Sequence, residues 1–366
     1  MRTANTRRSC HRFLVGIALA TTCACLPASQ APDAPSAHGD EFIQSPGFMV
    51  VADRRVFAVM AFLNAVGFDK EVANMPMHPV RTRVREMVSA SLRRHPDKLS
   101  AWKKRYADWN LQPFHYQDFA LSFTPDYPFR RVRQDSELGY PQTARRLREF
   151  PDILNDFWTT VDLPTVWEAV KPDYLAELGL YDLGRMAADL SSTWQYLRMT
   201  RSDSFVLVSI PNLLDSHYQA IGASYGRFYY SVESPGASAH TLNVHEYLHY
   251  IINPLVKANS RRQHAKLRAY FDAGKTGPMA RTYQEEVTFV YECLVRALDS
   301  RIDVTRTKDA EVRARIERRV ANETERGLNL VRPFYILLAE FEEARMPFNQ
   351  YLPILLERLP RHNATY

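Results

Sequence analysis

His245-Glu246-Tyr247-Leu248-His249 lies in a segment whose apolar residues recur at helical spacing. Each residue of a helix turns by about 100°, so the two histidines project from one face, about 40° apart. Two imidazoles at this spacing can bind one metal ion. Glu246 lies beside them, where a carboxylate can act on a water molecule. The pentapeptide therefore predicts a helix that carries half of a metal site.

The segments around this helix predict the fold class. Apolar and aromatic runs at residues 205–210 and 227–232 predict two strands, and the helix itself is expected over residues 239–252, before an Asn-Pro pair. Further helices are predicted over residues 282–299 and 309–328, and an apolar helix near the end of the chain. We therefore expect a mainly helical α+β protein with a small sheet next to the H-E-x-x-H helix.

Changes in composition, and the prolines and glycines that interrupt helices and strands, divide the chain into five segments. We predict a signal peptide, a linker rich in proline and small residues, a helical N-terminal region, a core that carries the motif, and C-terminal helices. Their expected bounds are 1–31, 32–47, 48–203, 204–300 and 301–366.

The first segment predicts export. A basic stretch with four arginines precedes a short apolar stretch at residues 13–20, and no later stretch is apolar enough for a transmembrane span. Cleavage by an ordinary signal peptidase is expected near residues 24–31. A lipid anchor on Cys23 or Cys25 is the alternative. The expected location is periplasmic or secreted.

Removal of the signal peptide changes two global inferences. Its four arginines leave without any acidic residue, so the formal charge falls from +6 to +2 and gives no reason to expect a nucleic-acid partner. Three of the four cysteines lie within residues 1–31, and only Cys293 remains in the mature chain. No internal disulfide is therefore expected. The sequence gives no indication of an oligomeric state.

A zinc site that catalyses hydrolysis needs a third protein ligand and one open position. The predicted helix over residues 282–299 offers Glu285, Glu286 and Glu292. Glu292 fits best, because it lies two turns after Glu285 and one turn before Arg296, on an otherwise apolar helix that would bury its charge. Cys293 is a softer ligand, but it points about 100° away from Glu292.

These residues resemble the gluzincin class of zinc metallopeptidases, in which a glutamate on a second helix completes the H-E-x-x-H site. More closely, the chain is similar to a family of secreted bacterial proteins of unknown function that is thought to be zincin-like. The matching elements are D-R-R-V-F at 53–57, H-P at 95–96, N-P at 253–254 and E-C-L-V-R-A at 292–297. The similarity covers roughly residues 48–299, and only H-E-x-x-H is specific by itself.

The resemblance implies an exported metallopeptidase with a zincin-like core and a Zn²⁺ cofactor. His245, His249 and Glu292 would hold the zinc, and Glu246 would be the general base toward a zinc-bound water that attacks a peptide or protein substrate. The alternatives are an exported zinc-containing binding protein without turnover and a zinc hydrolase of non-peptide amides.

Three features of the site stay open. In better-known gluzincins the third ligand follows the second histidine by about twenty residues, whereas Glu292 follows His249 by 43, which keeps Glu285 and Glu286 as alternatives. Arg296 is the candidate catalytic donor to the oxyanion, and its alternative role is that of a structural ion-pair partner of Glu292. The tyrosines that could act as the donor are Tyr247, Tyr283 and Tyr291. The strand expected over residues 227–232 is the candidate edge strand for a substrate peptide.

Overall fold

The computed structural model describes the residues from 42 onward, apart from short gaps and the last four residues. The described ranges are 42–45, 47–72, 75–135, 141–200, 206–237, 240–281, 283 and 285–362. Contacts divide the chain into Met1–Asp33 and Ala34–Tyr366, and every described residue belongs to the second unit. The predicted signal peptide, its cleavage site and the cysteines considered for a lipid anchor lie outside the described residues.

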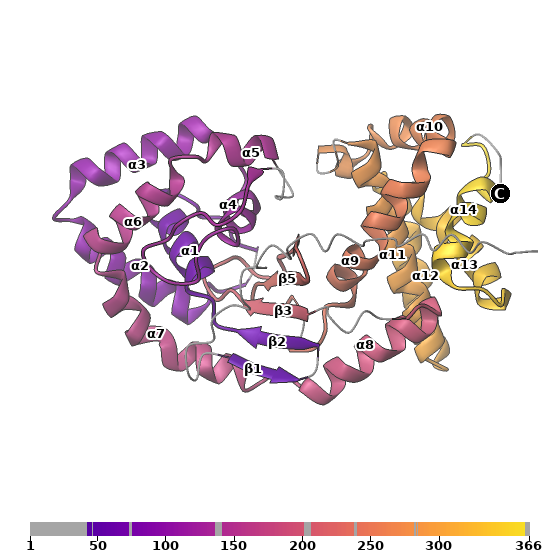
Figure 1. Ribbon diagram of the computed structural model, residues 1–366, viewed down its shortest axis with the longest axis horizontal. Coiled ribbons are helices and arrows are strands. Elements are labelled where there is room, and N and C mark those ends of the chain that lie inside the picture. Colours follow the sequence, from indigo (N-terminus) through magenta and orange to yellow (C-terminus); the bar gives the residue numbers. More distant parts are fainter. Residues whose placement is uncertain are drawn as a thin grey trace, which may run out of the picture. The chain divides into compact units, whose positions relative to one another are not determined.

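A mixed sheet of five strands lies at the centre of this unit (Figure 1). The strands are β1 (Phe42–Ser45), β2 (Phe48–Val51), β3 (Val206–Pro211), β4 (Ala220–Tyr225) and β5 (Phe228–Glu233). They lie in the order β1-β2-β3-β5-β4. The three inner strands are parallel to one another, and each outer strand is antiparallel to its neighbour. The sheet and its helices confirm the predicted mainly helical α+β class.

The helices before β3 begin with a common signal. Proline occupies one of the first two positions in most of them, where its fixed φ favours the first turn and its missing N–H costs nothing. These elements are α1 (Arg54–Val66), α2 (Pro79–Leu92), α3 (Pro96–Trp109), α4 (Pro113–Ala120), α5 (Pro141–Arg146), α6 (Phe150–Thr160), α7 (Leu163–Leu178) and α8 (Leu183–Leu197). Edge-to-face contacts join Phe62 of α1 to Trp102, Phe150 and Phe157, so aromatic packing holds this group together.

The helices after β5 form a second group, which Figure 1 shows on the other side of the sheet from α1. They are α9 (Val244–Asn259), α10 (His264–Gly274), α11 (Glu286–Arg306), α12 (Ala310–Glu325), α13 (Val331–Glu343) and α14 (Phe348–Arg358). Helix α9 packs against β4, β5 and α11. The motif helix therefore lies between the sheet and the helix that carries Glu292.

Strand β5 presents different residues to the two helical groups. Successive side chains of a strand point to opposite faces of its sheet. Tyr229 accordingly faces Glu246 of α9, whereas Tyr230 lies under the guanidinium of Arg55 at the start of α1, 5.9 Å from its ring centre. The strand therefore forms a wall shared by two layers.

Four strands differ from the sequence-based expectations. Residues 42–45, which we expected in a linker, form β1 because they pair with β2. Residues 48–51, which we expected in a helical region, form β2 because their apolar side chains are largely buried between β1 and β3. Strand β5 is an inner strand, so the predicted edge strand was wrong. The edge on that side is β4, whose small residues gave no strand signal.

Helix α9 is shifted relative to its predicted range. It begins at Val244 because the Asn243 side chain accepts a hydrogen bond from the backbone N–H of Glu246 and caps the first turn. It then continues through Pro254 to Asn259, although proline removes one backbone hydrogen bond. Contacts of α9 with α11 and α14 support the helix beyond the proline. Helix α11 likewise begins at Glu286 rather than 282 and extends to Arg306.

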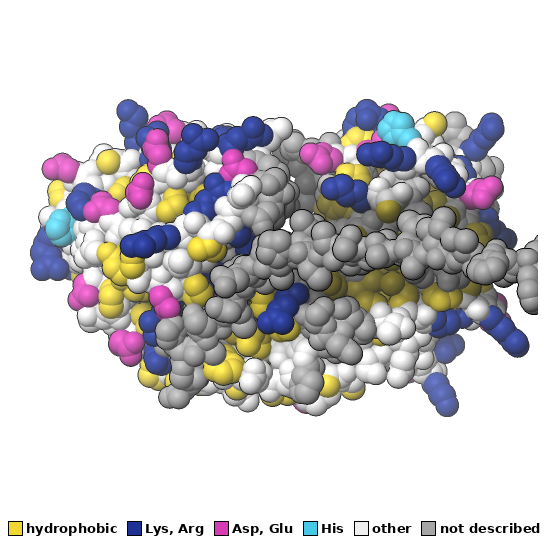
Figure 2. Space-filling view, in the orientation of Figure 1, with side chains coloured by type: hydrophobic (Ala, Val, Ile, Leu, Met, Phe, Trp, Pro, Cys, Tyr) yellow, Lys and Arg dark blue, Asp and Glu magenta, His cyan; other side chains and the backbone are white. Residues whose placement is uncertain are grey.

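None of the helices in the described part of the chain is long and apolar enough to cross a bilayer. On the face seen in Figure 2, basic and acidic side chains are interspersed along the periphery. This face therefore carries charges of both signs rather than one continuous basic field.

Candidate metal centre

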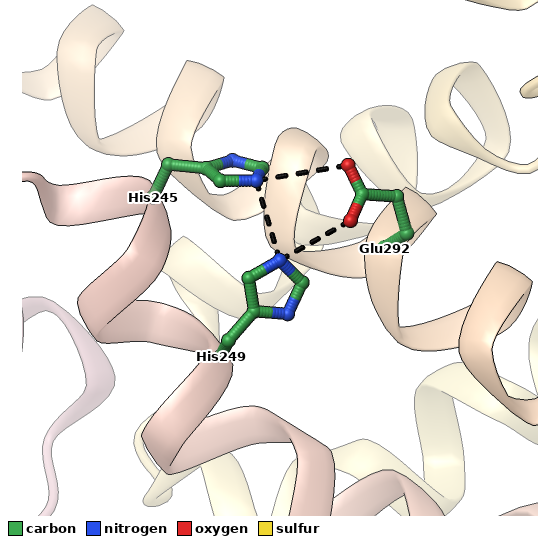
Figure 3. Close-up of side chains that lie close together, drawn as sticks. All are labelled: His245, His249 and Glu292. Carbon is green, nitrogen blue, oxygen red and sulfur yellow. Dashed lines mark hydrogen bonds and ion pairs between the residues drawn. The ribbon is translucent and has the colours of Figure 1, made fainter. Parts of the chain in front are cut away.

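The motif histidines project from the first two turns of α9 toward α11. Figure 3 shows His245 and His249 on one helix, with their rings directed at the carboxylate of Glu292 on the other. The side chains of His245 and His249 are 23% and 13% exposed, and that of Glu292 is 7% exposed. The group is therefore mostly buried and opens to solvent on the His245 side.

The three ligand atoms are spaced as a metal ion requires. The two Nε2 atoms of His245 and His249 lie 3.2 Å apart. The Nε2 atom of His245 is 3.6 Å from Glu292 Oε1, and that of His249 is 3.2 Å from Glu292 Oε2. Ligands about 2.0–2.1 Å from a tetrahedral zinc lie roughly 3.3–3.4 Å from one another. Two imidazoles and a carboxylate at these distances fit zinc in both donor type and spacing.

The other candidate ligands lie elsewhere. Glu285 is the exposed N-cap residue of α11, and Glu286 forms an ion pair with His264 at 2.8 Å. Cys293 is fully buried in the hydrophobic core. The structure thus brings only Glu292 of these four residues to the two histidines.

Arg296 holds the carboxylate of Glu292 from one turn further along α11. Its Nε donates to Glu292 Oε1 at 2.6 Å, and its Nη1 donates to Glu323 of α12 at 2.8 Å. Both interactions direct the guanidinium toward carboxylates. The arrangement orients the ligand, as outer partners of metal ligands commonly do.

The electrostatics of the site favour the metal-binding forms of His245 and Glu292, whereas His249 holds its proton more tightly than an ordinary histidine. Burial lowers the pKa of His245 to about 3, so its imidazole is neutral at neutral pH. Burial alone would raise the pKa of Glu292, but the hydrogen bond with His249 and the nearby positive charges outweigh it, and the pKa falls well below its usual range. Burial would lower the pKa of His249, yet the interactions with Glu292 raise it. The carboxylate is therefore charged and paired.

Glu246 is directed toward the sheet, beside the ligand group. Burial raises its pKa above that of an ordinary glutamate, and the positive charge of His249 and the Tyr229 hydroxyl partly offset this effect. A carboxylate with a raised pKa in a buried site is suited to accept a proton near neutral pH.

The three tyrosines proposed as oxyanion donors have different surroundings. The hydroxyl of Tyr247 accepts a hydrogen bond from Trp194 Nε1 at 2.7 Å, and this side chain is fully buried. Tyr291 donates to Thr288, while its ring packs edge-on against His249. Tyr283 interacts through its hydroxyl with both Glu292 and Arg296, and burial raises its pKa. Tyr283 is therefore the one of the three whose hydroxyl meets the third ligand.

Three neighbours of the site were not predicted: Gly222 on β4, Tyr229 on β5 and Glu323 on α12. None belongs to a motif. Strand alternation predicts which face of β5 carries Tyr229. It does not predict that Tyr229 faces Glu246 of α9. Glu323 lies in a helix whose charges at i,i+4 spacing indicate a solvated face.

Comparison of the chain with protein-family models, with curated proteins and with solved structures finds no match.

Proposed function

We propose that this chain is an exported zinc metallopeptidase of the zincin class. The observation that carries the proposal is the triangle of His245 Nε2, His249 Nε2 and the Glu292 carboxylate, whose sides match the edges of a tetrahedral zinc site. The adjoining carboxylate of Glu246 supports a hydrolytic role. The basic and apolar stretches within residues 1–31 support export.

The residues around the ligand group have distinct roles in this proposal. When bound, zinc supplies a Lewis acid that activates water and polarises a substrate carbonyl. Glu246 accepts the proton of the attacking water and delivers it to the leaving amine. Tyr283 donates a hydrogen bond to the developing oxyanion. Arg296, paired with Glu292 and Glu323, keeps the third ligand in place. This positioning role takes the place of the direct catalytic role predicted from the sequence.

Strand β4 is the proposed docking strand for the substrate. It is an outer strand of the sheet, it is antiparallel to β5, and it packs against α9. An extended peptide that adds to its outer edge would pass next to Glu246, because Gly222 of β4 lies against that carboxylate. A peptide or protein is therefore the proposed substrate class.

Zinc content and peptide cleavage test this function together. We expect one zinc per chain in the wild-type protein and cleavage of an unbiased peptide pool, read by mass spectrometry. Glu246→Gln should keep zinc and lose cleavage by at least about a hundredfold, because it removes only the general base. His249→Ala and Glu292→Gln should lose zinc as well.

Glu285→Gln provides the matched control for Glu292→Gln, since it makes the same chemical change at an exposed position of the same helix. It should change neither zinc content nor cleavage. Substoichiometric zinc in wild type would overturn the metal site. Full zinc without peptide cleavage would overturn the peptidase and favour a binding protein or a hydrolase of non-peptide amides.

A further inference from the structure

Strand β4 lacks a side chain at the point where β5 and α9 approach it. Gly222 of β4 pairs with Ser231 of β5, and Tyr229 lies two residues before Ser231 on the same face. A Cβ atom added to Gly222 would overlap the hydroxyl of Tyr229, lie 2.7 Å from its Cζ, and lie 2.8 Å from Glu246 Oε2. The phenol and the carboxylate therefore meet directly above the Cα atom of this glycine.

The Tyr229 side chain is buried, and packing fixes its hydroxyl next to Gly222 and Glu246. The side chain is 2% exposed, and its ring packs against that of Tyr250 with 5.6 Å between centres. Within the described part of the chain this hydroxyl makes no hydrogen bond of normal geometry, and the carboxylate of Glu246 is the group that acts on it most strongly. Burial of a hydroxyl is unfavourable unless it is paired, so packing alone does not account for tyrosine rather than phenylalanine here.

We propose that Tyr229 is a positioning residue for Glu246, and that Gly222 provides the space in which the two side chains meet. This proposal rests on the proposed function, in which Glu246 is the general base. A glutamate has several accessible rotamers, and a base that departs from its productive position by even an ångström loses much of its efficiency. The phenol has only two side-chain torsions and is fixed by packing, so it gives the carboxylate a rigid partner.

The role requires the hydroxyl and not merely the ring. Tyr229→Phe keeps the ring and removes one oxygen atom, so the packing against Tyr250 is retained. Tyr250→Phe is the matched control, because it makes the same change on the neighbouring ring without altering the contact with Glu246. Gly222→Ala tests the same contact from the opposite side, since its methyl group would displace both the phenol and the carboxylate.

The test uses the full-length protein loaded with zinc and acetohydroxamate as a probe. This small chelator binds zinc and gives its hydroxyl proton to an adjacent carboxylate, so its affinity reports the position of Glu246 without any substrate. We expect Tyr229→Phe to retain zinc and the wild-type melting temperature, and to bind acetohydroxamate about three- to tenfold more weakly. The kcat for peptide cleavage should fall about tenfold with KM unchanged. Tyr250→Phe should match wild type in zinc content, acetohydroxamate affinity and kcat.

Wild-type acetohydroxamate affinity and kcat in Tyr229→Phe would overturn the positioning role, and so would an equal loss in Tyr250→Phe. If Gly222→Ala does not fold, the phenylalanine variants alone decide the question. If wild type binds zinc and acetohydroxamate but cleaves no peptide, the proposed function falls, while the comparison of affinities still decides the role of Tyr229. If wild type binds no zinc, both proposals are overturned.

Discussion

Asp118 of α4 is a buried carboxylate that faces the sheet. The hydroxyl of Tyr225 on β4 contacts its backbone oxygen at 2.8 Å and its Oδ1 at 2.7 Å. Burial raises the pKa of Asp118 to about 6, and the hydrogen bond from Tyr225 only partly opposes this effect. The folded protein therefore holds this proton more tightly than the unfolded chain does.

This difference predicts a loss of stability between about pH 4 and pH 6. In this window the carboxyl is protonated in the folded state and ionised in the unfolded chain, so its contribution falls as pH rises. Asp118→Asn keeps an acceptor for Tyr225 and removes the charge. We expect it to raise the free energy of unfolding at pH 7.5 by about 1–3 kcal/mol and to leave it nearly unchanged at pH 4.

Urea unfolding of wild type and Asp118→Asn across this pH range measures the effect. The difference between the two curves should grow from pH 4 to pH 6 and then become constant. A constant difference at all pH values would contradict the prediction, because it would show that the charge of Asp118 does not contribute.

The sequence determined some residues of the site better than others. His245 and His249 could be predicted to share a face because helical periodicity acts over four residues. Glu292 could be inferred only from its polar position on an apolar helix. The contact of Gly222 with Tyr229 depends on the register between β4 and β5, which no local pattern specifies.

At the scale of elements, α11 and α12 are joined by a row of charges. Arg296 bridges Glu292 and Glu323, with 25% of its side chain exposed. One turn before Glu323 on α12, Arg319 reaches back to Asp303 of α11 at 2.9 Å. Glu323 of α12 holds Arg296, and Arg296 balances the charge of Glu292, so α12 supports the proposed metal centre without contributing a ligand.

We expect Arg296→Met to destabilise the metal-free protein more than the zinc-loaded protein. Without zinc, the variant removes the guanidinium that the buried carboxylates of Glu292 and Glu323 share, at a cost of the order of 3 kcal/mol. Bound zinc neutralises Glu292 and should remove part of this cost. Urea unfolding with a chelator and with zinc measures both values. Arg268→Met, which removes an exposed pair with Asp272, should have little effect in either condition.

An equal cost with and without zinc would contradict this prediction. It would mean that Arg296 stabilises the contact between helices and does not compensate the ligand.

Element boundaries were predicted less well than element types. The H-E-x-x-H helix was expected to end before Pro254, because proline ordinarily interrupts a helix, but tertiary packing carries α9 to Asn259, about two turns beyond the predicted end. Strand β4 has the sequence A-I-G-A-S-Y, and its small residues give little β-propensity. Its existence depends on pairing with β5, which is a property of the sheet and not of the segment.

At the scale of the whole molecule, the three proposed ligands come from helices separated by a basic connector, residues 257–281. Glycines fix this connector to the turn between α12 and α13. A Cβ on Gly274 would lie 2.5 Å from the backbone oxygen of Gly327, and one on Gly277 would lie 2.6 Å from the Cα of the same residue. Backbone contact of this kind is available only to glycine. The long connector is therefore anchored before α11 begins.

A metal that joins α9 to α11 should stabilise the whole unit. A ligand that binds only the folded state adds about 4 kcal/mol when its free concentration is a thousandfold above its Kd. We expect zinc to raise the melting temperature of wild type by several degrees and a chelator to reverse the shift. His249→Ala should abolish the response. His264→Ala, which changes a histidine outside the ligand group, should retain it.

Calorimetry of the three proteins with zinc and with chelator tests this linkage. A zinc-dependent shift that persists in His249→Ala would show that the metal binds elsewhere.

Strand β5 carries Tyr229 and Tyr230 toward opposite layers, one to Glu246 of α9 and the other to Arg55 at the start of α1. Because side chains alternate along a strand, inserting or deleting a single residue ahead of this pair would exchange the two tyrosines between the layers. Such a change would disturb both the surroundings of Glu246 and the packing of α1. Length in the β4–β5 hairpin is thus under a stricter constraint than composition, and a homologue should vary there by substitution and not by insertion or deletion.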